Sequence, residues 1–575
     1  MEIYWIKKIS IAAMFLSSCS SYAPVNDLHF IYKKTESFKE HESYANILYI
    51  AQSGDAKKAI EKYLERYKEN KEHQFELIRQ IGKIILEKSS SSRNPEDSLR
   101  AIFAAGIINN AENLPILEKA LNNPNPQIQI AGIHFLSNLQ DDRADELILE
   151  ALKSKYLPVR LEASLVLASK KRGVEQINSF MHKIEEDIQP LFPRFFVMIG
   201  DANATNIIYN LLASHKPEVC LETILSIIEF KRDDFLPQIR ALSFQQDLKQ
   251  QEACAAAFGA LRDGNSIPRL IELAHSPSEY VSLAAWKSLY LFGNEKAYSY
   301  LKQQALNGNL FAIANLKNVE ASVPLLLELL KSENMQIRIN AAISLLRSQK
   351  KVPISNLLEI LSKDKRDTVF YTQSSPGKSI NIWKAISPVS IETKNNPFIF
   401  EASQYMKEEV LKQSINLPEK DFLSIAHNIF LSRQSNLIPC LISLLETLNT
   451  QNSLNLLKTQ QQQLGFPLAR DYCNLSLFRL QETGPYLQNL KKWLEKYNDA
   501  ELIHFKSIAP FEFRFHKPSH YELHPEERSK LLVESCLALA ENRDEECVEI
   551  ILKTLAKSKP QNQCILAGIL LRAIE

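Results

Sequence analysis

Four histidines near the C-terminal end of the chain have a spacing that could bind a metal ion. His516, His520 and His524 follow one another at four-residue intervals, and His504 lies upstream. A helix would gather such residues on one face, but Pro518 interrupts any helix there. No acidic or cysteine pattern nearby completes a tetrahedral ligand set. We therefore expect these histidines to be structural or solvent-facing, with no bound metal.

A second stretch, Pro376-Gly377-Lys378-Ser379, has the lysine and hydroxyl of a phosphate-binding loop. Such a loop needs a strand before it and a glycine five residues before Gly377, where Thr372 stands, and we expect neither condition to be met. The sequence contains no G-x-S-x-G motif and no C-x-x-C pair, and His41-Glu42 lacks the second histidine of a zinc protease. These patterns predict no enzyme activity and no cofactor.

The N-terminus has the features of a secretory signal. Lys7 and Lys8 precede the apolar run Ile9–Leu16, which is much shorter than the ~20 residues that span a bilayer. The residues Leu16-Ser17-Ser18-Cys19 resemble the bacterial lipobox, whose cysteine is diacylated and becomes the new N-terminus. The resemblance implies a signal peptide over 1–18, a lipid anchor on Cys19 and a polar tether over 19–40. The alternatives are an ordinary signal peptide or a buried helix with a chance cysteine.

The composition favours an all-α fold. Only 14 of the 575 residues are glycine, and chains with many β-turns or phosphate-binding loops use more. The 68 basic and 67 acidic residues leave a net charge of +1, so no bulk charge draws the chain to nucleic acid or to an acidic membrane. We expect no nucleic-acid partner, and contact with a membrane through the lipid anchor only.

The middle of the chain repeats itself with a period of about 30 residues. A small residue, mostly alanine, recurs four positions after each predicted helix start, with Arg194 as the departure, and an apolar residue recurs eight positions after it. The predicted starts are Asp97, Ile128, Val159, Pro190, Val219, Lys249, Val281, Leu310 and Ile337.

The first helix of each pair has its own signature, a proline that follows an apolar residue and precedes an apolar helical run. Proline suits the first position of a helix, where its missing N–H would have no partner in the helix. The six examples are Pro115, Pro237, Pro268, Pro324, Pro353 and Pro439.

Segment 321–346 consists of two amphipathic helices joined by a polar turn and closely resembles a HEAT repeat, of which Leu157–Leu167 is a second partial copy. The resemblance implies an all-α protein, an α-α superhelix of HEAT or armadillo type. Its array covers 97–365, and degenerate HEAT-like helices follow over 398–500. The motif's arginines form a structural ladder between repeats, which is the role implied for Arg160, Arg338 and Arg470.

The two ends of the array are expected to be capped. Ser53–Tyr63 resembles the turn and second helix of a tetratricopeptide unit, which implies an N-terminal helical cap over 41–96. Three apolar helical segments predict a C-terminal helical cap over 525–575. Caps with one polar face are what a solenoid needs at its ends.

Two segments interrupt the repeats and supply the candidate partner-binding residues. The insertion loop over 366–397 contains Phe370, Tyr371 and Trp383, and it is either a binding arm or a strap that packs onto its own repeats. The extended, irregular segment over 501–524 has an alternating pattern typical of a strand. Its candidate residues are Phe511, Phe513 and Phe515.

The remaining seven cysteines are expected mostly on apolar helix faces, where a thiol behaves as a small hydrophobe. In an oxidising compartment Cys536, Cys547 and Cys564 could form a disulfide, because they lie on successive helices. The sequence leaves this pairing open.

Together these features predict a membrane-anchored lipoprotein scaffold, not an enzyme, whose solenoid surface binds a protein or peptide in the bacterial cell envelope. Ser20 after the lipidated cysteine resembles the signal for export to the outer membrane, at its periplasmic face or the cell surface. The alternative is a solenoid enzyme or small-molecule binder resembling the HEAT-like bilin lyases.

Overall fold

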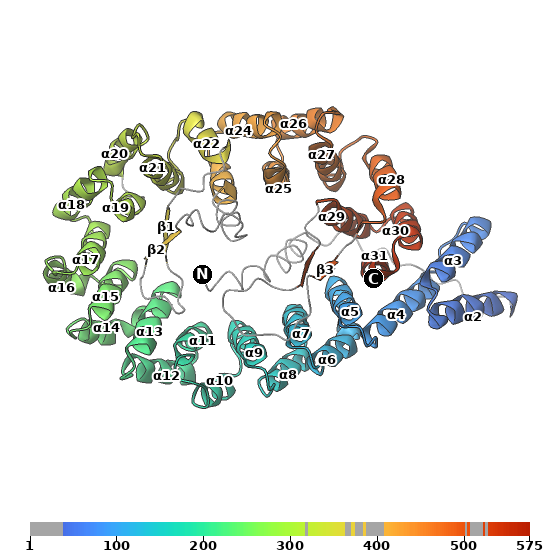
Figure 1. Cartoon of the computed structure of the whole chain (residues 1–575), viewed down its shortest axis with the longest axis horizontal. Coiled ribbons are helices and arrows are strands. Elements are labelled where there is room, and N and C mark those ends of the chain that lie inside the picture. Colours follow the sequence, from blue (N-terminus) through green and yellow to red (C-terminus); the bar gives the residue numbers. More distant parts are fainter. Residues whose placement is uncertain are drawn as a thin grey trace, which may run out of the picture. The chain divides into compact units, whose positions relative to one another are not determined.

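The computed structural model describes residues 38–316, 320–362, 370–373, 383–386, 407–500, 503–505, 521–523 and 527–575. Helices make up almost all of this part of the chain, with two short hairpins of strands (Figure 1). The chain divides into two compact units. Unit 1 combines the residues up to Phe180 with those from Gln481 onward, and unit 2 is Met181–Leu480.

Unit 1 contains the first and the last helices of the chain. They are α2 (Phe38–Ser53), α3 (Ala56–Asn70), α4 (Phe75–Ser90), α5 (Pro95–Ile108), α6 (Leu114–Leu121), α7 (Pro126–Asn138), α8 (Asp142–Ala151), α9 (Leu157–Ser169), most of α10 (Val174–Met181), α28 (Tyr486–Tyr497), α29 (Glu527–Asn542), α30 (Glu545–Lys557) and α31 (Pro560–Ile574).

Unit 2 continues the array. Its helices are α11 (Pro193–Ile199), α12 (Ala202–Leu212), α13 (Pro217–Glu229), α14 (Leu236–Leu242), α15 (Leu248–Ala260), α16 (Ile267–Leu273), α17 (Glu279–Leu291), α18 (Glu295–Leu306), α19 (Leu310–Asn315), α20 (Val323–Leu329), α21 (Met335–Arg347), α22 (Ile354–Ser362), a helix at 407–414, α24 (Glu419–Leu431), α25 (Ile438–Leu448), α26 (Gln451–Gln462) and α27 (Pro467–Arg479).

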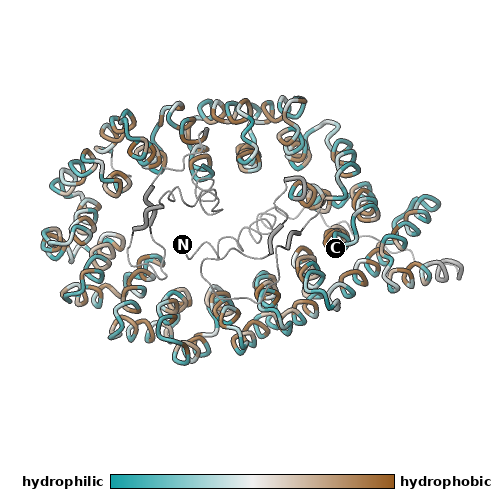
Figure 2. The backbone as a smooth tube through the Cα atoms, in the orientation of Figure 1, coloured by the Kyte–Doolittle hydropathy of each residue, from teal (hydrophilic) through white to brown (hydrophobic). Residues whose placement is uncertain are grey.

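Within each unit the helices form two layers. The second helix of one pair packs beside the second helix of the next, as α5, α7 and α9 do in unit 1 and α13, α15 and α17 do in unit 2. Each also packs on the first helix of its own pair, for example α7 on α6 and α17 on α16. Hydrophobic and hydrophilic residues alternate along the coils (Figure 2), so a helix can bury one side and expose the other.

The predicted repeat register is confirmed at eight of its nine marks, which fall within the first three residues of a helix. The small residues four positions later include Ala101, Ala163 and Ala253, which are fully buried where neighbouring helices meet. The mark at Pro190 is wrong, because that proline lies in a 3-10 turn and α11 begins at Pro193. Arg194 therefore lies outside the packed column and pairs with Glu229 at 2.9 Å.

The proline signature is confirmed as well. Five of the six prolines lie in the first turn of α6, α14, α16, α20 and α25, and Pro353 directly precedes α22. A 3-10 turn precedes each of those five helices. Its last residue is buried, so the entry into the helix is fixed by packing as well as by the proline.

Many second helices end in a left-handed turn that is built without glycine. Lys231 has a φ of 54°, and the N–H of Arg232 after it bonds to the carbonyl of Ile227 at 3.1 Å. The same arrangement recurs at Lys171, Arg262, Gln349 and Arg433, and with glycine at Gly293. Glycine usually takes this position because a Cβ is disfavoured there. The low glycine content thus reflects lysine, arginine and glutamine at left-handed positions.

Replacing Lys231 by glycine is therefore expected to stabilise unit 2. Glycine removes the strain that a Cβ causes in the left-handed conformation. This gain exceeds the cost of the greater conformational entropy that glycine has in the unfolded chain, so we expect the free energy of unfolding to rise by about 0.5–1 kcal/mol. Urea unfolding followed by helical circular dichroism measures it. Lys231→Ala is the control, since it removes the charged chain but keeps the Cβ. Equal stabilities of the two variants would contradict the explanation.

In unit 1 the C-terminal helices pack against the N-terminal ones. Helix α31 lies against α4 and α5, and α30 lies against α3. A Cβ at Gly568 of α31 would lie 2.8 Å from the Cα of Ala104, so the backbones of α31 and α5 come close together. The guanidinium of Arg572 donates to the carbonyl of Ile107 at 3.0 Å. Helix α5 is thus packed between α31 and α7.

Candidate interaction surface

The predicted insertion contains a hairpin in place of a plain loop. Strand β1 (Phe370–Gln373) pairs antiparallel with β2 (Trp383–Ile386), with Phe370 opposite Ile386 and Gln373 opposite Trp383. Strand β1 lies beside α19 and α21, which is the placement that a strap would have.

This hairpin also corrects one expectation about the phosphate-loop segment. A strand does precede Pro376-Gly377-Lys378-Ser379, because β1 ends at Gln373. The glycine that the loop needs is still replaced by Thr372, which lies within β1 and pairs with Lys384. The sequence requirement for phosphate binding therefore remains unmet.

The other candidate residues fall largely outside the described residues. Cys19 and the three phenylalanines Phe511, Phe513 and Phe515 are in this group. The expected extended segment does contain strands, β3 (Ile503–Phe505) and β4 (Tyr521–Leu523), which pair antiparallel. They lie on either side of the phenylalanine pattern that suggested them.

The structure shows a group of exposed apolar side chains in unit 2 that sequence reasoning missed. We call Phe244, Leu248, Ile271 and Tyr280 the turn patch, because they lie in or near the turns of two adjacent repeats. Phe244 and Tyr280 are 66% and 62% exposed. Phe244 follows α14 and Leu248 begins α15, whereas Ile271 lies on α16 and Tyr280 in the first turn of α17.

A cation contact links the two repeats of the turn patch. The guanidinium of Arg269 on α16 lies 4.4 Å from the ring centroid of Phe244, and it also donates to the carbonyl of Ser243. On α17, Trp286 stacks on Tyr300 of α18 with ring centroids 5.1 Å apart. The contact between Arg269 and Phe244 therefore joins side chains of two adjacent repeats beside an exposed aromatic ring.

The signal for the turn patch was present in the sequence but weak. The repeat register predicts polar turns between paired helices, and a phenylalanine within Ser243–Asp247 breaks that rule. Tyr280 directly precedes the buried Val281, so the sequence pattern places both residues on the apolar face of α17. Exposure separates these two neighbours, and a sequence pattern alone does not.

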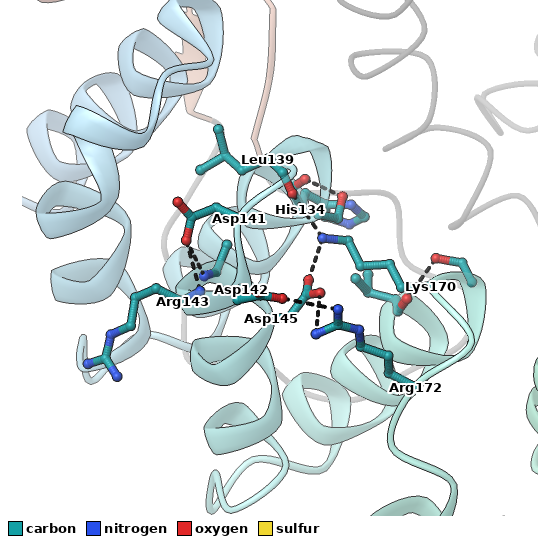
Figure 3. A network of polar contacts seen from close by, with 12 residues as sticks. His134, Leu139, Asp141, Asp142, Arg143, Asp145, Lys170 and Arg172 are labelled. Atoms are coloured by element: carbon teal, nitrogen blue, oxygen red, sulfur yellow. Dashed lines mark hydrogen bonds and ion pairs between the residues drawn. The ribbon is translucent and has the colours of Figure 1, made fainter.

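Polar networks join successive repeats elsewhere. Asp145 of α8 is almost buried and accepts from Lys170 at 2.5 Å and from Arg172 at 3.0 Å (Figure 3). Lys170 also donates to the carbonyl of Leu139 at 3.0 Å, and Arg172 reaches Asp142 at 3.1 Å. Figure 3 shows Lys170 and Arg172 converging on the Asp145 carboxylate from the end of α9. The network fixes adjacent repeats, and we assign it no chemistry.

A similar bond holds two repeats of unit 2 together. Arg240 donates twice to Asp263, at 2.7 and 2.9 Å, and Ser266 donates to the same carboxylate at 2.5 Å. Burial alone would raise the pKa of Asp263, but the bonds from Arg240 and Ser266 outweigh it and lower the pKa below its usual value. Asp263 is therefore an ionised structural anchor.

The three arginines of the HEAT-like motif have different partners. Arg338 pairs with Glu359 of the next helix at 2.7 Å, which agrees with a ladder between repeats. Arg160 lies over the ring of Phe180 at 4.7 Å, and Arg470 pairs with the adjacent Asp471 at 2.9 Å. A cross-repeat ion pair is therefore seen for Arg338.

The cysteines of the described chain are free thiols, so the pairing among Cys536, Cys547 and Cys564 that the sequence left open is not formed in the structure. Burial raises the pKa of Cys547 to about 11 and that of Cys564 to about 12. Such thiols remain protonated and behave as apolar packing groups. The part of the chain that the structure describes also has no cluster of histidine, cysteine and acidic side chains able to hold a metal.

Two further features bear on ligands and membranes. A shallow depression between α28 and α30 is lined by Lys491, Glu495, Asn498, Ile550, Lys553, Thr554 and Lys557. Its space is about that of one water molecule, too little for an organic ligand. Among the described helices, none combines the length and the apolar character needed to cross a bilayer.

Comparison with known proteins shows repeats of the expected kind. Residues 83–168 match the family of HEAT repeats. No curated protein sequence matches the chain.

The similar solved structures have low sequence identity to this chain and low TM-scores. The complex of CpcE and CpcF of phycocyanin lyase from Nostoc sp. is 17% identical, with 36% of this chain and 89% of that chain covered and a TM-score of 0.28. A Kap95p complex with RanGDP is 12% identical, with 91% and 81% covered and a TM-score of 0.30. Kap121p is 11% identical, with 98% and 69% covered and a TM-score of 0.26. The repeat match and the two-layered helix pairs together identify the fold as a HEAT-type α-solenoid.

Proposed function

We propose that this protein is a lipid-anchored scaffold of the bacterial cell envelope whose solenoid surface binds a protein or peptide partner. A stack of helical pairs suits protein–protein interaction, because it offers a long surface to which many repeats contribute. The proposal makes three specific claims: the lipid anchor on Cys19, the location in the cell envelope and the position of the binding surface.

The turn patch is the observation that carries the binding part of the proposal. Phe244 and Tyr280 expose large aromatic rings, and Arg269 lies over the ring of Phe244. Aromatic residues and arginine are the types most enriched where protein interfaces gain their free energy. A partner that covers Phe244 and Arg269 would remove an exposed aromatic ring and the cation over it from water.

The anchor part of the proposal rests on the sequence. Cys19 follows a basic start and a short apolar run, in the setting of a lipobox. The net charge of +1 gives no electrostatic route to a membrane surface, so acyl chains on Cys19 would supply the attachment. Ser20 favours the outer membrane as the destination.

A photocross-linking experiment in cells tests both parts. We expect a photoreactive phenylalanine derivative in place of Phe244 to give a discrete protein adduct in the membrane fraction. The matched control places the same derivative at Tyr49, which is 70% exposed on α2 of unit 1. Cys19→Ser should move the protein from the membrane to the soluble fraction.

The binding surface and the lipid anchor can be contradicted independently of each other. No adduct at Phe244 above the Tyr49 control would contradict the binding surface, whatever the location of the protein. Full membrane retention of Cys19→Ser would contradict the anchor, whatever the cross-linking result. Mass spectrometry of the adduct identifies the partner.

A further inference from the structure

A buried histidine lies where the N-terminal and C-terminal helices of unit 1 meet. His73 follows α3 in the connection to α4, and it is 5% exposed. Its ring stacks on Tyr67 with centroids 4.0 Å apart and planes within 8°. The ring also lies close to the backbone carbonyl of Glu545, the first residue of α30, although its Nε2 makes no well-formed hydrogen bond.

The hydrogen bonds around His73 determine which ring nitrogen carries the proton. The N–H of Gln74 donates to the hydroxyl oxygen of Tyr63 at 3.2 Å, and that oxygen lies 2.9 Å from Nδ1 of His73. We assign the phenol hydrogen to the bond with Nδ1, which lies within hydrogen-bond distance, while the N–H of Gln74 occupies a lone pair of the phenol oxygen. The neutral ring then carries its proton on Nε2, on the side of Glu545.

A second proton on His73 would disturb this chain of bonds. Protonated Nδ1 becomes a donor, so the Tyr63 hydroxyl must turn its own hydrogen away. Tyr63 is 2% exposed and lies in the same buried cluster as His73. Water therefore does not replace Nδ1 as the acceptor, and the hydroxyl hydrogen would be left without a partner. A buried polar group without a partner is costly. The start of α30 is also the positive end of its dipole, which disfavours a cation there.

The other charged and titratable groups do not reverse this preference. Glu545 and Glu549 of α30 attract a proton to His73, while Tyr63 and Tyr67 of α3 and Phe75 of α4 enclose the ring. Lys553 of α30 affects the pKa of Tyr67, and Tyr44 of α2 affects the pKa of Tyr63. Neither is among the groups that shift the pKa of His73. Burial is the largest effect, and it lowers the pKa of His73 below that of a free histidine.

We propose that neutral His73 is the proton-sensitive element of a latch that holds α30 and α31 on α3, α4 and α5. The latch is at full strength above the ordinary pKa of histidine, about 6.5, and weakens as the pH falls below it, because the open form takes up the proton more readily. The chain leaves unit 1 after Phe180 and returns at Gln481, so the latch joins two segments of unit 1 that are far apart in the sequence.

Hydrogen exchange followed by mass spectrometry tests the latch on the full-length Cys19→Ser protein. After correction for intrinsic exchange rates, we expect the protection of α30 and α31 to fall at least threefold between about pH 7.5 and about pH 5.5. Helix α15 of unit 2 is the internal reference and should not change. In His73→Asn, which keeps an amide in place of the ring, the pH dependence should disappear.

A matched control and a second readout keep the test decisive. His182→Asn removes an exposed histidine of unit 2 and should retain the full pH dependence. If His73→Asn does not fold, alkylation of wild-type Cys564, a buried thiol of α31 near Ser89 of α4, replaces it. Its rate relative to Cys254, fully buried in α15, should rise at least threefold at the lower pH. An unchanged ratio, or equal pH dependence with and without His73, would overturn the proposal.

Discussion

Replacing Gly568 by leucine is expected to detach α31 from α5 and to lower the stability of unit 1 by about 3 kcal/mol. A Cβ at this position would lie 2.8 Å from both the Cα and the Cβ of Ala104 and 2.9 Å from its carbonyl oxygen. These are mostly backbone atoms, so they cannot move aside without shifting α5. The same helix pair also contains the bond from Arg572 to Ile107, which would be lost on separation.

The alanine variant makes the prediction sharper, because its expected sign is unusual. Alanine normally stabilises a helix by roughly 1 kcal/mol relative to glycine. At Gly568 we expect a loss instead, since a single methyl group already meets the backbone of Ala104. Hydrogen exchange of α31 and α5, with α15 as reference, measures the local effect. Gly264→Ala is the control because its Cβ would meet no atom within 4 Å. A stabilising Gly568→Ala would refute the close packing.

The second large effect is expected at Asp145. Its removal leaves Lys170 and Arg172 without the carboxylate on which both converge, and breaking a buried pair from one side is costly. Breaking a fully buried pair costs about 3–5 kcal/mol. Arg172 is half-exposed and Lys170 keeps its bond to Leu139, so we expect Asp145→Ala to lower the free energy of unfolding by a smaller amount, about 2–3 kcal/mol. Urea unfolding and exchange at α8 and α9 report it.

The neighbouring Asp142 provides the matched control. It pairs with Arg172 at 3.1 Å, yet its side chain is 89% exposed. An ion pair in water contributes little, so Asp142→Ala should have only a small fraction of the Asp145 effect. Comparable losses in the two variants would show that burial is not what gives the network its strength.

Most of the repeat architecture could be predicted from the sequence, because its causes are local. Buried alanines such as Ala163 and Ala253 follow the helix starts at a fixed distance, and prolines such as Pro115 and Pro268 mark the first turn. The register fails near Pro190, where the chain forms a 3-10 turn before α11. The pattern assigns Pro190 to the start of a repeat helix, although it belongs to the connection before α11.

The surface features could not be predicted in the same way, because they depend on contacts between distant residues. Phe244 and Val281 are both large and apolar, and only the packed helices expose the first and bury the second. The neutral form of His73 depends on burial where α3 and α4 meet α30, and α30 is far away along the chain. Lys231 in a left-handed turn is another case, since its residue type gives no hint of that conformation.

The docking of α31 between the first helices also determines the order in which the chain can mature. The bond from Arg572 to Ile107 joins residues 465 positions apart, so the packing of α4 and α5 cannot be completed until α31 has been synthesised. Until then the apolar sides of α4 and α5 that receive α31 remain open to chaperones and proteases. A premature stop codon anywhere before α31 would therefore damage the beginning of the protein as well as its end. Complete packing of α4 and α5 therefore requires that translation has passed α31.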